Sequence, residues 1–283
     1  MAKVVCATRV GNMKDTNPET RGTLDVLDLP VKELGDDDVL IKVAYCGICG
    51  SDPHVVDGCF NKPEDAPFGI GHEMSGVIER LGKNATAKGL KVGDRVGGNF
   101  LGYCGKCYQC SIGHPEYCTG VSNQPCMAEY VVWNEAQVCK LPDGVSLREG
   151  SLMEPLSIAV RAMDKIGMLV GKRVLVSGGG PIGLLCAQLA AKYGAAELTL
   201  SEPVANRCEI AKKIGVEHIV NPITEDLYER AMEITNGIGY DVILECSAVP
   251  SAATSVLKCA AKYANPLALL RQMDIPGIDV IWN

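Results

Sequence analysis

The chain has 283 residues, of which 47% are hydrophobic and 22% are charged, so it can form one large or two ordinary globular domains. This composition excludes a disordered or collagen-like chain. Because 27 Lys and Arg stand against 34 Asp and Glu, the net charge of −7 excludes a broad basic surface for nucleic acids or anionic lipids. The N-terminus has no apolar run of signal-peptide length, and no stretch approaches the roughly 20 apolar residues of a membrane span. The sequence therefore predicts a cytoplasmic protein with small-molecule partners.

The first half of the chain reads as mainly β. Up to about residue 155, short β-like runs are broken by Gly, Pro and Asp, as at residues 39–45, 75–79 and 128–133. This pattern predicts an irregular β domain with long loops over residues 1–155.

The second half alternates between strands and helices. Strands are predicted at residues 173–177, 197–201, 218–220 and 240–246, and helices at residues 181–193, 203–214, 224–235 and 251–262. Such alternation is typical of βαβ units on a parallel sheet. The sequence thus predicts an α/β fold with a doubly wound domain over residues 156–283.

A glycine-rich turn follows the first strand of this second half and opens its first helix. The turn fits G-x-G-x-x-G, in which the glycines permit a tight turn, close approach of a pyrophosphate and close packing of the helix. An acidic residue ends the next strand, 22 positions after Gly180, where it would accept hydrogen bonds from ribose hydroxyls and repel a 2′-phosphate. This favours NAD over NADP, although a nearby Arg could receive that phosphate. The alternative is a glycine-rich turn that binds nothing. The predicted cofactor-binding residues are Gly178, Gly180, Pro181, Ile182, Gly183, Glu202 and Arg207.

Four of the fourteen cysteines lie within 15 residues, in a lobe over about residues 100–120. They are Cys104, Cys107, Cys110 and Cys118. Four thiolates at this spacing can surround one tetrahedral Zn²⁺ and leave no open position, so the lobe is predicted to hold a structural zinc. The alternatives are a disulfide pair or a coincidental cluster. The scattered cysteines are predicted to be small buried hydrophobes; they are Cys6, Cys59, Cys126, Cys139, Cys186, Cys208, Cys246 and Cys259.

A second candidate metal site combines two short segments. Residues 46–49 form a Cys-x-x-Cys motif, but a redox pair of this type would be expected near a βαβ pattern, which begins about 120 residues later. Cys49, taken with His72 and Glu73, instead offers a thiolate, an imidazole and a carboxylate. Such an incomplete ligand set is typical of a catalytic zinc that stays open to water or substrate. The alternative is a structural His beside a Glu.

Several of these motifs, in this order, resemble a known family over about residues 24–250. The motifs are Cys-Gly-Ser-Asp-x-His at 49–54, Gly-His-Glu at 71–73, Val-Gly-Asp-Arg-Val at 92–96, the cysteine lobe at 104–118, Glu-Pro-Leu-Ser at 154–157 and Gly-Gly-Gly-Pro-Ile-Gly at 178–183. Together they are similar to the zinc-dependent medium-chain alcohol dehydrogenases. Glu154, where classical alcohol dehydrogenases have Cys, resembles the polyol, butanediol and threonine dehydrogenase branch.

The resemblance implies a GroES-like catalytic domain followed by a Rossmann-type NAD-binding domain. It implies that Cys49, His72 and Glu73 hold the catalytic zinc and that Glu154 binds the metal's water or exchanges with it. Asp52 would orient a ligand such as His72. The family also leads us to expect a homo-oligomer.

The resemblance further implies the reaction. A zinc-bound alkoxide of a secondary alcohol, such as a polyol, vicinal diol or hydroxy amino acid, would pass hydride to NAD. Ser51 would bond to the substrate hydroxyl, and His54 would pass its proton towards solvent. The alternatives are a zinc- and nucleotide-binding protein of this family with impaired catalysis and a zinc-free quinone reductase. The complete set of Cys49, His72 and Glu73 argues against the last.

The C-terminus departs from the family pattern. A complete doubly wound domain has six parallel strands, but only about 20 residues follow the helix predicted at residues 251–262. Leu267 to Leu270 would supply a stunted fifth strand, and residues 271–283 match no expected element. The sequence therefore predicts missing or altered C-terminal strands, through truncation or a shifted reading frame, and a poorly positioned hydride acceptor.

Overall fold

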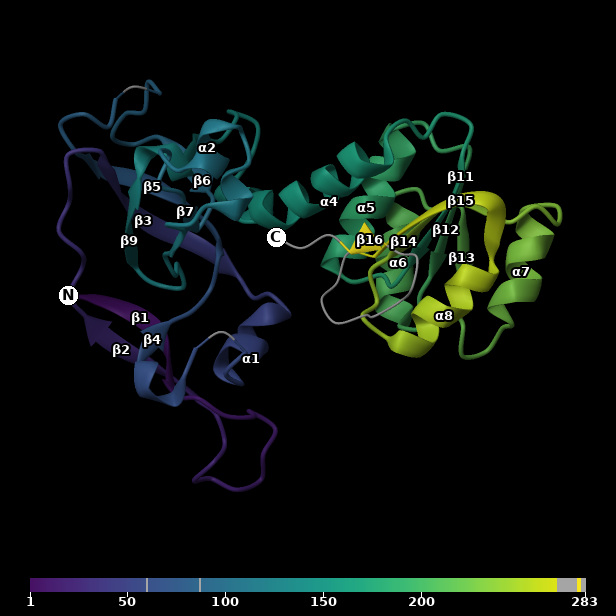
Figure 1. The fold of residues 1–283 in the computed structure, drawn as a ribbon, viewed down its shortest axis with the longest axis horizontal. Coiled ribbons are helices and arrows are strands. Elements are labelled where there is room, and N and C mark those ends of the chain that lie inside the picture. Colours follow the sequence, from purple (N-terminus) through teal and green to yellow (C-terminus); the bar gives the residue numbers. More distant parts are fainter. Residues whose placement is uncertain (60, 87, 269–278, 281–283) are drawn as a thin grey trace. The chain divides into compact units, whose positions relative to one another are not determined.

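A computed structural model describes residues 1–59, 61–86, 88–268 and 279–280. The chain divides into two compact units, Met1–Glu154 and Pro155–Asn283 (Figure 1). Within the described residues, no helix combines the length and the apolar character needed to cross a membrane.

The first unit is built on a five-stranded antiparallel sheet of order β10-β6-β5-β3-β9. Its strands are β3 (Asp38–Gly47), β5 (Glu73–Leu81), β6 (Arg95–Gly98), β9 (Tyr130–Asn134) and β10 (Val138–Lys140). Apolar side chains on these strands form its core, with Ile41, Met74, Ile78 and Trp133 among the largest fully buried ones. The sheet therefore fixes the backbone at the ends of β3 and at the start of β5.

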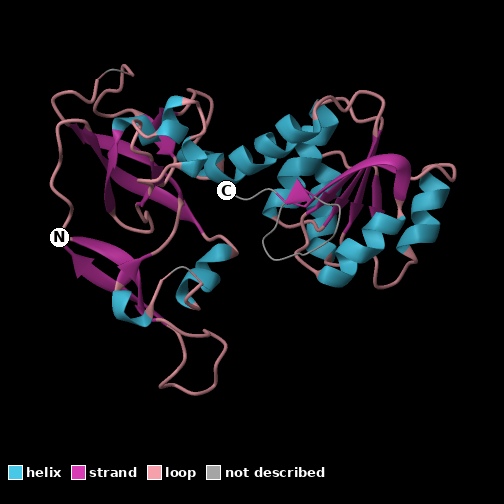
Figure 2. Ribbon diagram, viewed as in Figure 1, coloured by secondary structure: helices cyan, strands magenta, loops and turns pink. Residues whose placement is uncertain are grey.

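Two small sheets and several short helices complete this unit (Figure 2). The small sheets contain β1 (Ala2–Arg9), β2 (Thr23–Leu29) and β4 (Phe68–Gly69), and β7 (Leu101–Gly102) with β8 (Ser122–Asn123). The helices are α1 (Ser51–Val56), α2 (Tyr108–Ser111), α3 (Leu147–Gly150) and the 3-10 turns η1 (Pro63–Asp65), η2 (Pro115–Tyr117) and η3 (Glu135–Gln137). Helix α4 (Met153–Ile166) begins at the end of the unit.

The second unit is a parallel sheet of order β13-β12-β11-β14-β15-β16. Its strands are β11 (Arg173–Ser177), β12 (Glu197–Ser201), β13 (His218–Val220), β14 (Tyr240–Glu245), β15 (Ala260–Ala268) and β16 (Asp279–Val280), and its helices are α5 (Pro181–Lys192), α6 (Ala205–Lys213), α7 (Leu227–Ile234) and α8 (Pro250–Lys258). The strand order reverses between β11 and β14, which is the place where doubly wound sheets bind ligands. The predicted α/β fold is confirmed.

Helices cover both faces of this sheet, as Figure 1 shows. On β11, Val174 and Val176 pack with residues of α5 and α6, whereas Leu175 packs on the opposite face with residues of α7 and α8. Because alternate residues of a strand face opposite ways, a strand covered on both sides must be apolar throughout. This explains why residues 174–176 form a continuous apolar run.

The structure corrects the expected C-terminus. Helix α8 ends at Lys258, four residues earlier than predicted, and the nine-residue strand β15 follows it and pairs with β14. Gly239, with φ +87°, lets the chain approach closely here, since a Cβ at this position would lie 2.7 Å from the carbonyl oxygen of Cys259. Pairing with β14 thus overrides the helical tendency of residues 259–262. A full fifth strand is present, and the two-residue β16 pairs with it in the sixth position. The expectations for residues 269–278 and 281–283 lie outside the described residues.

Candidate active site and metal centres

Three side chains from two segments meet in the first unit. The potential ligand atoms of Cys49, His72 and Glu73 all lie within 4.8 Å of one another. Cys49 follows β3, and Glu73 begins β5, which pairs with β3 through the register Gly47 to Glu73. The pairing of two strands therefore brings together residues that are 23 positions apart in sequence.

Asp52 connects the two ligand segments. It lies in α1 and is 4% exposed. Its Oδ2 accepts a hydrogen bond of 2.8 Å from the Cys49 backbone N–H, and its Oδ1 lies 3.5 Å from Nδ1 of His72. Oδ1 is buried without a hydrogen-bond partner of standard geometry. An imidazole whose Nδ1 faces a carboxylate offers Nε2 to a metal, so this orphaned oxygen fits the support of a ligating histidine.

Two further residues shape the cluster and were not identified from the sequence. A Cβ on Gly47 would lie 2.2 Å from Oε2 of Glu73, so a side chain here would displace that carboxylate from its present position. The ring of Phe100 lies 5.0 Å from the His72 ring, at an interplanar angle of 42°. Gly47 could have been noticed as the central glycine of the Cys-x-x-Cys motif, whereas nothing in the sequence pattern singles out Phe100.

The cluster changes the protonation of its members. Burial by itself would lower the pKa of His72, but interactions with Asp52 and Cys49 outweigh it and raise that pKa to about 10. Burial raises the pKa of Glu73, and the opposing effects of His72 and Cys49 only partly offset it. A His that attracts a proton this strongly would also attract a divalent cation, which competes with protons for the same ligands.

The other predicted catalytic residues lie on helices α1 and α4. Glu154 lies at the start of α4, outside the three-ligand cluster. Burial raises the pKa of Glu154 to about 7, with a lowering contribution from His72 and a raising one from Glu73. Ser51 and His54 both lie on α1, Ser51 partly buried and His54 exposed.

The four cysteines of the lobe form a second, closed cluster. The ligand atoms of Cys104, Cys107, Cys110 and Cys118 lie within 4.8 Å of one another. Sγ of Cys107 is 3.5 Å from that of Cys110 and 3.9 Å from that of Cys118. Four sulfurs at about 2.3 Å from one tetrahedral Zn²⁺ are about 3.8 Å apart, so the observed spacing fits a zinc ion.

Backbone N–H groups stabilise the negative charge that clustered thiolates carry. The N–H groups of Cys104 and Gly120 each donate to Sγ of Cys118 over 3.3 Å, and that of Cys107 donates to Sγ of Cys104 over the same distance. Backbone N–H groups, those of Cys110 first, lower the pKa of Cys107 to about 6. The loop thus stabilises the thiolate, the form that binds metal, at Cys104 and Cys107, whereas desolvation raises the pKa of Cys110 to about 12.

The glycine-rich turn lies between β11 and α5, where the strand order of the parallel sheet reverses. Gly178 has φ +91°, and a Cβ on Gly183 would lie 1.9 Å from the carbonyl oxygen of Gly178. At Gly180, which caps α5, a Cβ would meet no atom within 4 Å. The turn therefore packs tightly at Gly178 and Gly183 and leaves open space at the helix N-terminus, the arrangement that fits a pyrophosphate.

Comparison with known proteins adds the family. The family described as Alcohol dehydrogenase GroES-like domain matches residues 35–143, and that described as Zinc-binding dehydrogenase matches residues 181–265. The chain is 37% identical over 265 residues to a sorbitol dehydrogenase from Halalkalibacterium halodurans, covering 90% of this chain and 76% of that one. It is 37% identical over 260 residues to an L-threonine 3-dehydrogenase from Escherichia coli, covering 89% of this chain and 74% of that one.

A solved structure agrees with these relatives. A zinc-binding dehydrogenase from Sinorhizobium meliloti, bound to NADP, matches with a TM-score of 0.83 and 28% identity, covering 100% of this chain and 80% of that one. The chain belongs to the zinc-binding alcohol dehydrogenase family. The GroES-like and Rossmann-type halves expected from the sequence are confirmed, and this dehydrogenase is an alcohol oxidoreductase whose cofactors are zinc and a nicotinamide nucleotide.

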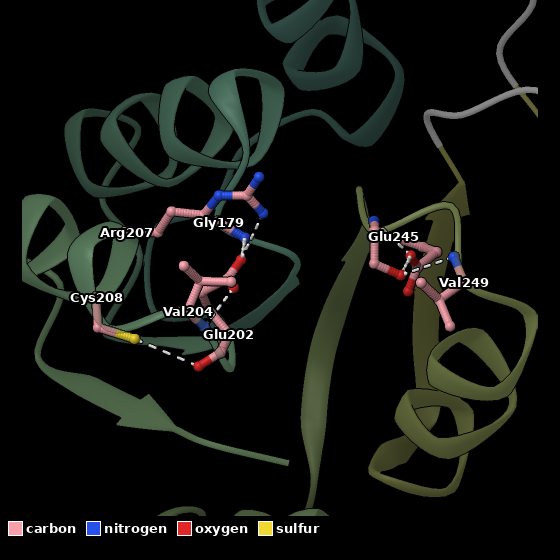
Figure 3. A network of polar contacts seen from close by, with 8 residues as sticks. Gly179, Glu202, Val204, Arg207, Cys208, Glu245 and Val249 are labelled. Carbon is pink, nitrogen blue, oxygen red and sulfur yellow. Dashed lines mark hydrogen bonds and ion pairs between the residues drawn. The ribbon is translucent and has the colours of Figure 1, made fainter. Parts of the chain in front are cut away.

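Figure 3 shows how the dehydrogenase holds the acidic residue after β12. Glu202 is 1% exposed. Its Oε2 accepts a hydrogen bond of 2.6 Å from the Gly179 N–H, and its Oε1 accepts one of 2.7 Å from the Val204 N–H. Arg207 Nη1 lies 3.5 Å from Oε2. Since a carboxylate has about four acceptor positions, these contacts leave about one for a ligand. Glu202 therefore fastens the glycine-rich turn to the end of β12, a role that the sequence pattern did not reveal.

A second buried carboxylate ends β14 in the same picture (Figure 3). Glu245 is 1% exposed, and its Oε1 accepts hydrogen bonds from the N–H and the hydroxyl of Ser247. A Cβ on Gly178 would lie 2.8 Å from Cα of Ser247, so the turns after β11 and β14 touch. Glu202 and Glu245 thus each brace a turn at the carboxyl edge of the sheet.

The scattered cysteines do not all behave as predicted. Cys6, Cys126, Cys186, Cys246 and Cys259 are buried, but Cys59 and Cys139 are exposed. Cys139 lies on the edge strand β10, in which only the first residue is buried. Cys59 follows the short helix α1. The interpretation of these two as buried hydrophobes was wrong, because their strand and turn present them to solvent.

Proposed function

We propose that this chain is a zinc-dependent dehydrogenase that oxidises a secondary alcohol with NAD. The observation that carries the proposal is the cluster of Cys49, His72 and Glu73, braced by Asp52. Three protein ligands of mixed type are typical of catalytic zinc, which keeps one position for water or substrate. The cysteine lobe, with four thiolates, would hold the structural zinc.

A zinc ion bound in the cluster supplies Lewis acidity, which lowers the pKa of an alcohol and polarises a ketone. The chain's own residues then handle the proton. Ser51 and His54 are three positions apart on α1, and residues at this spacing are neighbours on one helix face. Because Ser51 is partly buried and His54 is exposed, a proton taken by the Ser51 hydroxyl can pass to His54 and on to solvent.

The glycine-rich turn supports the nucleotide site. The open space beside Gly180 and the N-terminus of α5 suit a pyrophosphate. The buried negative charge of Glu202 disfavours a 2′-phosphate, which supports NAD as the preferred cofactor. Arg207 opposes this preference, since its side chain is 48% exposed and retains donors for a phosphate. The Sinorhizobium relative is bound to NADP, and a similar dehydrogenase from Escherichia coli is complexed with NADH.

The proposed substrate is a secondary alcohol with a polar neighbour, such as a polyol, a vicinal diol or a hydroxy amino acid. Similarity to a sorbitol dehydrogenase and to a threonine dehydrogenase supports this class. Glu154 supports it too, since an acidic group near the cluster, with a pKa raised by burial to about 7, suits a site that binds polar substrates.

The decisive experiment measures NAD reduction by the zinc-loaded protein with sorbitol, 2,3-butanediol and threonine, with and without a chelator. We expect turnover with at least one substrate and loss of that turnover when zinc is removed. Binding of zinc and NAD without turnover of any substrate would favour a zinc- and nucleotide-binding protein with impaired catalysis. The short strand β16 is the feature that makes this second outcome worth testing.

The cofactor preference is tested by Glu202→Ala, with Arg207→Ala as the matched change. We expect the unaltered protein to prefer NAD and Glu202→Ala to shift the ratio of kcat/KM values towards NADP by about tenfold. Arg207→Ala should shift that ratio the opposite way. A preference for NADP in the unaltered protein would contradict the role given to Glu202.

A further inference from the structure

The Cys-x-x-Cys motif at residues 46–49 is divided by the fold. Cys49 joins the candidate zinc ligands, whereas Sγ of Cys46 lies 3.9 Å from Sγ of Cys126. Cys46 is on β3, and Cys126 lies 80 positions later, between β8 and β9. Cys46 therefore pairs in the structure with Cys126 and not with Cys49, its partner in the sequence motif.

The pair of Cys46 and Cys126 adjoins the two segments that carry the candidate zinc ligands. Cys46 precedes Cys49 by three residues on one side. On the other side, the Cys126 N–H donates to the carbonyl oxygen of Gly71 over 3.0 Å, and Gly71 precedes His72. A Cβ on Gly71 would lie only 3.0 Å from Sγ of Cys46, so the three segments are in close contact. Each sulfur thus lies next to a segment that carries a candidate zinc ligand.

We propose that Cys46 and Cys126 are a modification site, at which a peroxide forms a reversible disulfide that opens the cluster of Cys49, His72 and Glu73. Cys46 is half-buried and Cys126 is fully buried, so Cys46 is the thiol that a small oxidant reaches. The sulfurs must approach from 3.9 Å to the bond length of about 2.05 Å. This contraction pulls the segments before Cys49 and before His72 out of their present positions.

The chemistry balances in two steps. The Cys46 thiol attacks hydrogen peroxide, breaks its O–O bond and becomes a sulfenic acid, releasing one water. The Cys126 thiol then attacks the Cys46 sulfur, forms the S–S bond and expels the second water. Two thiols lose two electrons and two protons, and one peroxide takes up both. A dithiol reductant reverses the reaction by exchange.

The first test maps the disulfide in the zinc-loaded full chain after treatment with hydrogen peroxide and alkylation of the remaining thiols. Trypsin places Cys46 in a fragment spanning residues 43–80 and Cys126 in one spanning residues 107–140, so fragment sequencing must locate the bond. We expect a Cys46–Cys126 cross-link that dithiothreitol removes. Cross-linking of Cys46 to Cys49, or free Cys46 and Cys126 when other thiols are oxidised, would overturn the proposal.

The second test follows zinc content. The unaltered chain should lose one of two zinc equivalents in peroxide and recover it with dithiothreitol and zinc. Cys126→Ser should lose that zinc at least fivefold more slowly, whereas Cys139→Ser, which removes an exposed thiol from the same tryptic fragment, should behave like the unaltered chain. Equal loss in Cys126→Ser would show direct oxidation of the ligands and overturn the coupling to the cluster.

These readouts are separate from the dehydrogenase activity. The zinc measurement rests on the proposed ligands, but the cross-link does not. A chain that forms the cross-link yet turns over no alcohol would refute the proposed function alone. A chain that turns over alcohol without forming the cross-link would refute this inference alone. Cross-link mapping uses unaltered protein, so it stands even where Cys126→Ser fails to fold.

Discussion

The two candidate metal clusters lie in the same half of the chain but are assembled in opposite ways. The lobe takes four sulfurs from one loop of 15 residues, whereas the cluster of Cys49, His72 and Glu73 takes three different atoms from two segments. The lobe is supported by its own backbone N–H groups, and the other cluster by Asp52 from α1. A closed, self-contained site suits a structural ion, while an open site held by its surroundings suits one that meets a substrate.

Removal of a ligand from the open cluster should have the largest effect. We expect Cys49→Ala to lower the zinc content from two equivalents to one and to reduce turnover about 1,000-fold or more, because the Lewis acid is lost. The fold should persist, since β3 and β5 remain paired. Zinc analysis and steady-state kinetics check this, with Cys59→Ala, an exposed thiol in the same region, as control. Unchanged turnover in Cys49→Ala would contradict the proposed site.

Removal of a ligand from the lobe should act on stability first. We expect Cys107→Ser to lose the other zinc equivalent and to lower the free energy of unfolding by about 3 kcal/mol, because metal binding and folding of the loop are linked. Limited proteolysis and hydrogen exchange should show increased opening of residues 100–120. If Cys107→Ser keeps both zinc ions and its stability, the lobe does not hold a metal through these thiolates.

Substitution of Asp52, which supports the open cluster without being one of its three ligands, should have the smallest effect of the three changes. Asp52→Asn keeps the shape of the side chain but removes the charge that faces His72. We expect turnover or zinc affinity to fall by about 10- to 100-fold, the usual cost of losing such a supporting group. The lobe's zinc should stay, which metal analysis can verify. A variant with full activity and zinc affinity would mean that His72 is oriented by other contacts.

Local sequence patterns predicted much of the fold. The strands at residues 173–177, 197–201 and 218–220 match their predicted bounds, because buried parallel strands are largely apolar and are bounded by turn residues. The end of α8 was missed because residues 259–262 suit a helix in isolation, and only pairing with β14 draws them into β15. That pairing depends on the approach permitted by Gly239, which local propensity does not register.

The candidate sites also differ in how far the sequence predicted them. The lobe and the glycine-rich turn were visible in sequence because their residues are close together along the chain. The ligand set of Cys49, His72 and Glu73 was a candidate from its chemistry alone, and the resemblance to a family supported it, since a spacing of 23 residues implies no contact by itself. The contacts of Phe100 and Cys126 with this region had no signal in the sequence, because residues far apart along the chain meet there only in the folded structure.

The sequence by itself determined the chemistry that is available: four clustered thiolates, a glycine-rich turn and an unusual number of cysteines. The tertiary structure decided which groups act together. It places Cys49 beside His72 and Glu73. It also brings Cys46 next to Cys126 and joins Glu202 to the glycine-rich turn by a hydrogen bond. The physical reason is that side chains within one loop meet by chain connectivity, whereas side chains on separate strands meet only where the hydrogen-bonded register of the sheet aligns them.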